Sequence, residues 1–175
     1  IKSAKNTVSE KIKGTRVGDT LHDKSMNKGL SKTVLINKYL ISMDTERKVN
    51  KFVIHCSASD SPKYDLEAIR RDHKKNGWDD IGYHYVIKRD GTLEVGREEH
   101  RTGSHARAVN GTSIGICLIG GSNKEGDWEN NFLPEQFDTL KQILETLQDK
   151  YDIKKIIGHY EVDDKKKCPS FNVKE

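Results

Sequence analysis

Residues Lys51–Cys56 read K-F-V-I-H-C, and residues Ser113–Ile119 read S-I-G-I-C-L-I. Both runs are short, mostly apolar and bounded by polar or turn-forming residues, a pattern typical of buried β-strands. The first run carries a histidine, His55, next to its end, and the second is followed by Gly120-Gly121, a pair that favours a turn. The two runs predict a mostly buried strand and a central strand, and the other elements can be placed around them.

Two helices are predicted after these strands. Asp65 can cap a helix in which Leu66, Ile69 and His73 fall on one face, and Asn76-Gly77 is a suitable end for it. Pro134 is tolerated in the first turn of a second, longer helix. The apolar residues that follow it recur at helical spacing and form one face: Phe137, Leu140, Leu144, Leu147 and Tyr151.

Three further strands complete the predicted sheet. The β-like runs Tyr83–Lys88 and Thr92–Val95 are joined across Asp90-Gly91, a two-residue hairpin signal. Lys155–Gly158 is a last short strand. Strands that alternate with helices, together with one hairpin, predict an α/β fold with a mixed central β-sheet and helices on both of its faces.

Composition limits the class of protein. The 175 residues fit one ordinary domain with a short appendage, and the mean hydropathy is −0.81. No apolar run approaches the roughly 20 residues that a membrane-spanning helix needs. Three cysteines cannot form a disulfide framework. These observations exclude a membrane-spanning role and a disulfide-stapled miniprotein.

Residues 1–50 differ from the rest and form a basic N-terminal extension, which leaves 51–175 as the folded domain. The extension holds eleven Lys and Arg against five Asp and Glu, so it carries +6, and because the whole chain carries +4 the remainder carries −2. Its one dense apolar patch, Val34–Met43, suits a short helix or a strand but cannot build a core alone. The extension is therefore either a solvated tail or an adhesive segment for an anionic surface such as a cell envelope.

The residues suited to chemistry lie at strand ends. His55 closes the first predicted strand, His159 follows the last one, and Cys168 comes nine residues later. Two imidazoles and one thiolate are a sensible ligand set for one Zn²⁺, and three protein ligands leave a fourth position open for catalysis. The spacing alone is weak, since a single histidine is more often structural and a single cysteine is more often a buried thiol.

Several exact strings resemble one family. They are V-I-H-C-S-A-S at Val53–Ser59, G-W-D-D-I-G-Y-H-Y-V-I-K-R-D-G-T at Gly77–Thr92, G-S-H-A at Gly103–Ala106, S-I-G-I-C-L-I-G-G at Ser113–Gly121 and C-P-S-F at Cys168–Phe171. In this order, from about Phe52 to Asn172, they closely resemble the type 2 N-acetylmuramoyl-L-alanine amidases, with the peptidoglycan recognition proteins as more distant kin. The resemblance implies a zinc hydrolase that cuts the amide between N-acetylmuramic acid and the L-alanine of the stem peptide.

The resemblance also implies roles for individual residues. The family's zinc ligands fall on His55, His159 and Cys168, and its active-site tyrosine falls on Tyr83. Its catalytic lysine, two places before the ligand cysteine, falls on Lys166. The loop before Cys168 is one residue longer than in the phage enzymes, so Lys165 and Lys167 remain alternatives. His105, in G-S-H-A, matches a histidine that lines the family's cleft, which implies a contact with substrate.

Amide hydrolysis would require a nucleophilic water and a group that stabilises the oxyanion, and these residues could supply both. Zinc would lower the pKa of a bound water towards about 7, Tyr83 could orient or deprotonate that water, and a lysine could stabilise the oxyanion. Tyr83 could also be an ordinary hairpin residue. Cys56 and Cys117 lie in apolar strands and are expected to be buried free thiols. His84 alternates with Tyr83, so it is expected to face the other side of the sheet and to be structural.

The function expected is that of a phage endolysin: a monomer made in the host cytoplasm that degrades cell-wall peptidoglycan. The alternatives are a peptidoglycan-binding module that has lost catalysis, which the presence of Cys168 opposes, and a secreted bacterial amidase toxin or autolysin domain. Regulation of a phage RNA polymerase is a third class, which zinc ligands do not imply. Nucleic-acid binding by residues 1–50 is disfavoured, because no set of aromatic side chains accompanies the charge.

Overall fold

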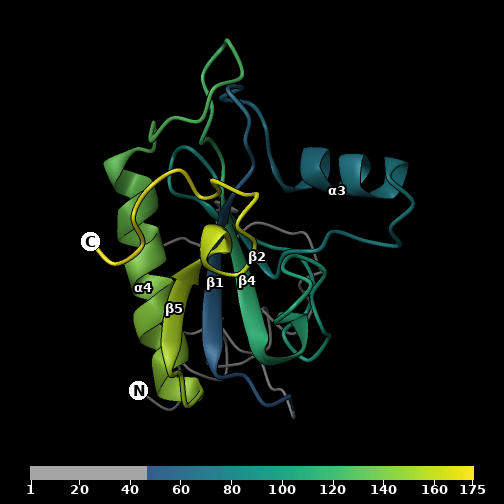
Figure 1. Ribbon diagram of the computed structural model, residues 1–175, viewed down its shortest axis with the longest axis vertical. Helices are drawn as coiled ribbons and strands as arrows, with labels where there is room; N and C mark the ends of the chain where they lie inside the picture. The colour runs from purple at the N-terminus through teal and green to yellow at the C-terminus, as the bar shows by residue number, and fades with distance from the viewer. Residues whose placement is uncertain (1–46) are drawn as a thin grey trace, which may run out of the picture.

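The structure is a computed structural model that describes residues 47–175. The apolar patch Val34–Met43 lies outside the described residues. In chain order the elements are β1 (Lys51–Cys56), α3 (Leu66–Lys75), β2 (Tyr85–Ile87), β3 (Leu93–Val95), the 3₁₀ turn η1 (Asn110–Thr112), β4 (Ser113–Leu118), α4 (Pro134–Lys150), β5 (Lys155–Gly158) and the 3₁₀ turn η2 (His159–Glu161) (Figure 1).

The strands form one five-stranded mixed sheet in the order β3-β2-β4-β1-β5. The four strands β2, β4, β1 and β5 are parallel, and β3 pairs antiparallel with β2 through the predicted hairpin. The two runs that define the fold, β1 and β4, lie side by side at the centre, where Ile54 pairs with Ile116. The mixed sheet expected from the sequence is therefore confirmed.

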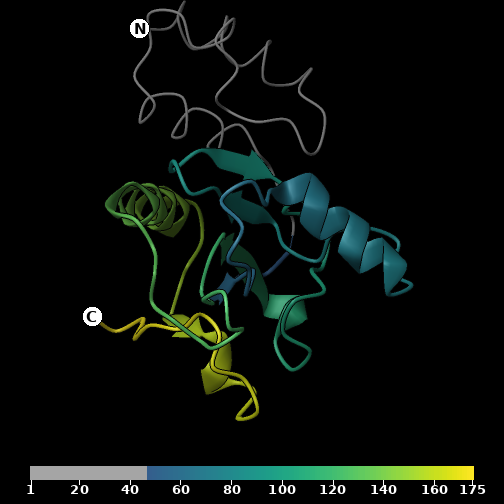
Figure 2. The same cartoon turned by 90° about the horizontal axis from the view of Figure 1, so that it is seen from above.

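One helix covers each face of the sheet, as the turned view in Figure 2 shows. Leu140, Ile143 and Leu147 of α4 pack against alternate residues of the central strands, including Ile54 and Ile116. Residues of α3 pack on the opposite face against Val86 and Cys117. Successive side chains of a strand point to opposite faces of the sheet. Ile54 packs against α4, so its neighbour His55 lies on the face that α3 covers.

The predicted helix boundaries have identifiable causes. The carboxylate of Asp65 accepts a hydrogen bond of 2.9 Å from the backbone N–H of Ala68, which makes it the N-cap of α3. The buried carboxylate of Glu94 accepts a second one of 2.9 Å from the N–H of Leu66. Helix α4 begins at Pro134, and its buried Gln136 donates to the carbonyl of Ile119 at the end of β4, which ties this helix to the sheet.

The described chain begins with residues that belong to the packed domain. Val49 is 5% exposed and is part of the α4-side core. The guanidinium of Arg47 donates to the carbonyls of Glu99 and Ser113, at 3.0 Å each. These contacts hold the segment before β1 against the edge where β4 begins. Within residues 47–175, neither helix has the length and apolar character needed to cross a bilayer.

Candidate metal centre

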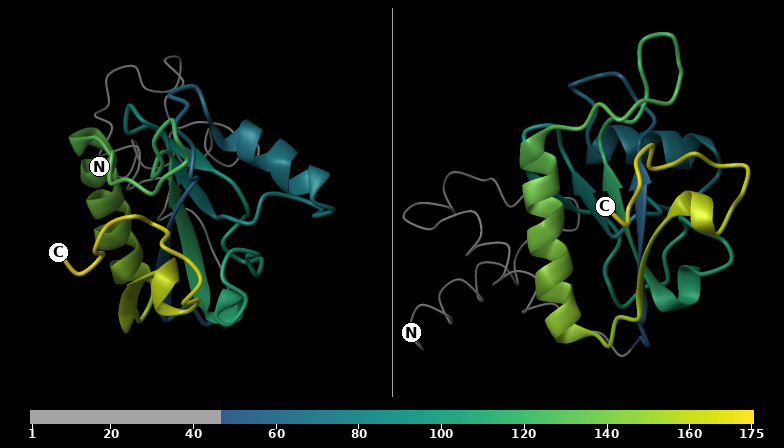
Figure 3. Two further views of the ribbon diagram at one scale, coloured as in Figure 1. Left: turned by 45° about the horizontal axis from the view of Figure 1, so that its top comes forward. Right: turned by 60° about the vertical axis from the view of Figure 1, so that its left-hand side comes forward.

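Parallel pairing brings two of the predicted ligands together. In the register of β1 and β5, Ile54 lies opposite Gly158, so His55 and His159 follow at the same edge of the sheet. Their ring centroids are 4.6 Å apart. The C-terminal segment, yellow in Figure 1 and seen from another side in Figure 3, returns over this edge and carries Cys168. One ligand atom from each of these three residues lies within 4.8 Å of the others.

The donor set fits Zn²⁺, which prefers imidazole and thiolate ligands. Burial, reinforced by the neighbouring His105 and His159, lowers the pKa of His55 well below its usual value, so this ring stays neutral and keeps a lone pair for a metal. A hydrogen bond with the Cys56 thiol and, to a lesser extent, burial raise the pKa of Cys168. Its sulfur therefore keeps a proton until a cation displaces it.

Tyr83 lies on the helix α3 side of this cluster. Its ring centroid is 5.0 Å from that of His55, and the residue is only half-buried. Burial of the phenol raises the pKa of Tyr83 well above its usual value. The hydroxyl therefore keeps its proton at neutral pH and can donate a hydrogen bond.

Of the three consecutive lysines, Lys166 acts most directly on the cluster. All three are exposed in the loop that leads to Cys168. Burial lowers the pKa of His159, the nearby carboxylate of Asp163 opposes this shift, and the positive charge of Lys166 adds to it. Of the three lysines, Lys166 is thus the one whose charge bears on His159.

His105 lies behind His55 and not on an open surface. The residue is 8% exposed, and its Nδ1 lies 2.9 Å from Nε2 of His55. Its other ring nitrogen lies 3.3 Å from the hydroxyl of Ser113. Both polar atoms of this ring thus face protein groups, and the contact with substrate that the resemblance implied stays a prediction.

His84 corrects one expectation. It was expected on the opposite face from Tyr83, yet its ring centroid is 5.8 Å from that of His105, within the same group of rings. The reason is that β2 begins only at Tyr85, so strict alternation does not extend back to Tyr83. The structural role holds: Nδ1 accepts from the N–H of Gly115 at 3.0 Å, and Nε2 lies 2.9 Å from the carbonyl of Arg101.

One supporting role was not predicted from the sequence, that of His73. The ring of His73 in α3 lies 5.5 Å from Tyr83, and its Nδ1 accepts a hydrogen bond of 3.0 Å from the N–H of Gly82. This bond fixes the backbone immediately before Tyr83. The signal was available, because His73 shares a helix face with Leu66 and Ile69 and therefore points at the sheet. The cysteines Cys56 and Cys117 are buried free thiols, as predicted.

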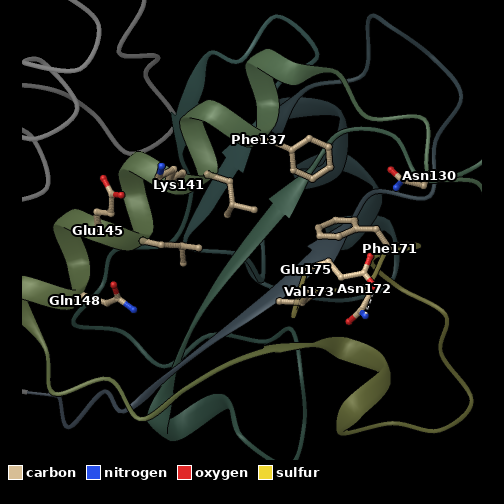
Figure 4. Close-up of a pocket in the computed structure, with 11 residues that line it drawn as sticks. Asn130, Phe137, Lys141, Glu145, Gln148, Phe171, Asn172, Val173 and Glu175 are labelled. Carbon is tan, nitrogen blue, oxygen red and sulfur yellow. Dashed lines mark hydrogen bonds between the residues drawn. The ribbon is translucent and has the colours of Figure 1, made fainter.

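A separate groove of about 590 Å³ lies between α4 and the C-terminal segment (Figure 4). Phe137, Leu144, Phe171 and Val173 give it apolar walls, and polar residues such as Lys141 line its rim. None of the predicted site residues lines this groove. The chemistry of the described residues is therefore concentrated at the strand ends and not here.

Comparison with known proteins shows which family this chain is similar to. The Amidase_2 family profile, described as N-acetylmuramoyl-L-alanine amidase, matches residues 45–171. The endolysin of Escherichia phage T7 is 47% identical over 122 residues, which cover 69% of this chain and 80% of that protein. The endolysin of Enterobacteria phage K11 is 39% identical over 76% of this chain and 88% of that protein.

Solved structures share the fold. The N-acetylmuramoyl-L-alanine amidase LysCS from Clostridium intestinale URNW superposes with a TM-score of 0.64 at 32% identity, over 72% of this chain and 78% of that one. Drosophila PGRP-LB superposes with a TM-score of 0.61 at 29% identity, over 71% and 76%. The profile match, the phage relatives and the shared fold lead to one conclusion: this chain belongs to the N-acetylmuramoyl-L-alanine amidase family of enzymes.

Proposed function

We propose that this chain is a zinc-dependent peptidoglycan hydrolase that cleaves the amide between the lactyl group of N-acetylmuramic acid and L-alanine. The observation that carries the proposal is the convergence of His55, His159 and Cys168, whose ligand atoms lie within 4.8 Å of one another although they come from three separate segments. Membership of the amidase family supports the same substrate bond.

These three residues would hold one zinc ion. When bound, zinc supplies a nucleophilic water at neutral pH and polarises the amide carbonyl. Tyr83 donates its phenolic proton in a hydrogen bond that orients the attacking water or the carbonyl. The ammonium of Lys166, whose charge acts on His159, stabilises negative charge that develops on the amide oxygen.

The biological role that fits is that of a phage endolysin. Relatives at 36–47% identity carry that name or are amidases and recognition proteins of peptidoglycan. The chain would then be made in the host cytoplasm, act as a monomer on the cell wall, and use residues 1–50 as an extension from the 51–175 domain. The charge of +6 on that extension supports attachment to an anionic envelope surface.

The reaction is tested by identifying the bond that breaks. Purified sacculi are incubated with the zinc-loaded protein, and the products are separated and identified by mass spectrometry. Stem peptides with a free N-terminal L-alanine, and glycan strands that have lost their peptides, are the expected products. Binding to sacculi without release of peptides would favour the alternative, a recognition module. The Cys168→Ser variant is the matched control for contaminating hydrolases.

A further inference from the structure

We propose that His105 is a positioning residue: its Nδ1 accepts the Nε2–H of His55 and thereby keeps the Nδ1 lone pair of His55 directed at the metal centre. This inference rests on the proposed function, because it concerns how the same centre is prepared for zinc. His105 would not itself bind zinc.

The positions of the two rings define the relationship. Nδ1 of His55 lies 3.8 Å from Sγ of Cys168, on the side where the three ligand atoms converge. Nε2 of the same ring lies 2.9 Å from Nδ1 of His105. A neutral imidazole carries only one N–H, so one of these two nitrogens of His55 donates a hydrogen bond and the other keeps a lone pair.

The contact between Ser113 and Val109 determines which atoms donate in the series of hydrogen bonds from Ser113 to His55. The hydroxyl of Ser113 donates to the carbonyl of Val109 at 2.8 Å, and a carbonyl oxygen can only accept. The proton of that hydroxyl is thus committed, so its oxygen accepts from Nε2 of His105, 3.3 Å away. Nδ1 of His105 is then the unprotonated nitrogen and must accept from His55. A backbone carbonyl therefore sets the tautomers of two histidines in sequence.

The ring of His105 is also held in place sterically. A Cβ at Gly115 would lie 2.5 Å from Cγ of His105, and a Cβ at Gly103 would lie 2.5 Å from its Cδ2. Glycine at these two positions creates the slot that the ring fills. The side chain of Asn110 accepts from the N–H groups of His105 and Ala106, at 2.9 and 2.8 Å, and fixes the backbone that carries the ring.

Such an arrangement is suited to tuning a metal ligand. A metal-binding histidine whose other nitrogen is held by a hydrogen-bond acceptor is fixed in tautomer and orientation, and loss of that partner typically weakens metal binding about 10- to 100-fold. A substrate contact would instead need an exposed polar atom, whereas His105 is 8% exposed and both its ring nitrogens face protein atoms.

Two variants of the full chain separate the positioning role from mere packing. His105→Phe keeps a flat ring in the slot but removes the acceptor, whereas His105→Asn places an oxygen close to where Nδ1 stood. Zinc affinity is measured by competition with a chelator of known affinity, and the visible spectrum of the Co²⁺-substituted protein reports the ligand geometry. The exposed His100, changed to Phe, is the matched control, since it lies outside the cluster.

The expected result is that His105→Phe binds zinc about 10- to 100-fold more weakly and shifts the Co²⁺ bands, while His105→Asn stays within a few-fold of the unmodified chain. Equal affinity and spectra for all three proteins would overturn the positioning role while leaving the proposed function intact. Failure of the unmodified chain to bind zinc at all would instead overturn the proposed function.

A measurement without substitution keeps the inference testable if a variant does not fold. Long-range ¹H–¹⁵N correlation spectra of the unmodified protein distinguish the two neutral histidine tautomers by their nitrogen shifts. His55 and His105 are both expected with the proton on Nε2. An Nδ1–H tautomer at His55 would overturn the proposal.

Discussion

The backbone N–H of Cys56 donates a hydrogen bond of 3.1 Å to Sγ of Cys168, across 112 residues of sequence. This bond joins the end of β1 to the loop that completes the metal centre. Burial and the Cys56 thiol keep this sulfur protonated without a cation, but hydrogen bonds to an ionised acceptor are stronger than neutral ones, so this contact favours the thiolate once a cation displaces the proton. The strand that carries His55 therefore also prepares the third ligand.

Tyr83→Phe separates chemistry from metal binding. The phenol is protonated and 5.0 Å, ring to ring, from His55, so removal of the hydroxyl leaves the ligands intact but removes a hydrogen-bond donor. We expect stoichiometric zinc, measured by elemental analysis, and a loss of about 100-fold or more in turnover. Turnover that stays near that of the unmodified chain would make Tyr83 a structural residue of the hairpin.

The three consecutive lysines provide their own controls. Lys166→Ala is expected to lower kcat by about 100-fold with little change in zinc content, because a positioned charge that stabilises an oxyanion contributes on this scale. Lys165→Ala and Lys167→Ala are expected to keep most of the activity. Turnover of the three variants is compared on the same muropeptide, and a loss confined to Lys165→Ala or Lys167→Ala would reassign the role.

Parallel pairing explains how much of this site the sequence could predict. His55 and His159 end two strands that are recognisable from apolar runs, and parallel neighbours in a sheet bring their carboxyl ends together. Cys168 is different, since it arrives through an irregular loop whose path no periodicity encodes. Its chemistry made it a possible third ligand, and only the family resemblance gave it that role.

The contact of His105 with His55 was not predictable for a related reason. It depends on the slot left by Gly103 and Gly115, two glycines from separate segments. A glycine in a strand indicates that something approaches closely, but not which side chain does so. The face on which His84 lies was predicted wrongly for a different reason. The start of β2 at Tyr85 decides where the alternation of side chains begins, and the sequence did not locate that boundary.

Because His84 is buried, we expect the free energy of unfolding of the protein to fall in acid. Burial lowers the pKa of His84 to about 3, whereas an unfolded histidine titrates near 6.5. Between these values the unfolded state binds a proton that the folded state does not. The contribution of His84 is therefore complete above about pH 6.5 and is lost as the pH falls towards 3.

The measurement is urea unfolding between pH 7.5 and 5 with chelator present, so that zinc binding does not contribute. The free energy of unfolding should fall with pH, and His84→Gln should reduce the slope by up to about 1.4 kcal/mol per pH unit. This variant loses two hydrogen bonds and should be less stable throughout. An unchanged slope would show that His84 does not titrate in this way.

Truncation tests the boundary of the folded domain. A chain that starts at Glu46 keeps Arg47 and Val49, so we expect it to fold, bind zinc and hydrolyse small muropeptides at close to the full rate. A chain that starts at Lys51 loses both residues and should melt at a lower temperature. A large drop in melting temperature already at Glu46, with loss of activity on small substrates, would show that residues 1–45 belong to the core.

The same truncation tests attachment to the cell envelope. Loss of most of the basic extension should weaken binding to whole sacculi or outer-membrane surfaces at low salt. The difference from the full chain should disappear as salt rises, because the Debye length falls from about 10 Å at 0.1 M to about 3 Å at 1 M. A difference that persists at 1 M salt would point to apolar contacts instead of charge.

Metal dependence tests the central claim most directly. Zinc is removed from the full chain with a chelator, and release of L-alanine-terminated peptides from sacculi is measured before and after stoichiometric Zn²⁺ is returned. Activity should disappear and then recover, and Cys168→Ser should not recover at the same zinc concentration, because a hydroxyl is a far poorer ligand than a thiolate. Full hydrolysis by the metal-free protein would contradict a zinc mechanism built on His55, His159 and Cys168.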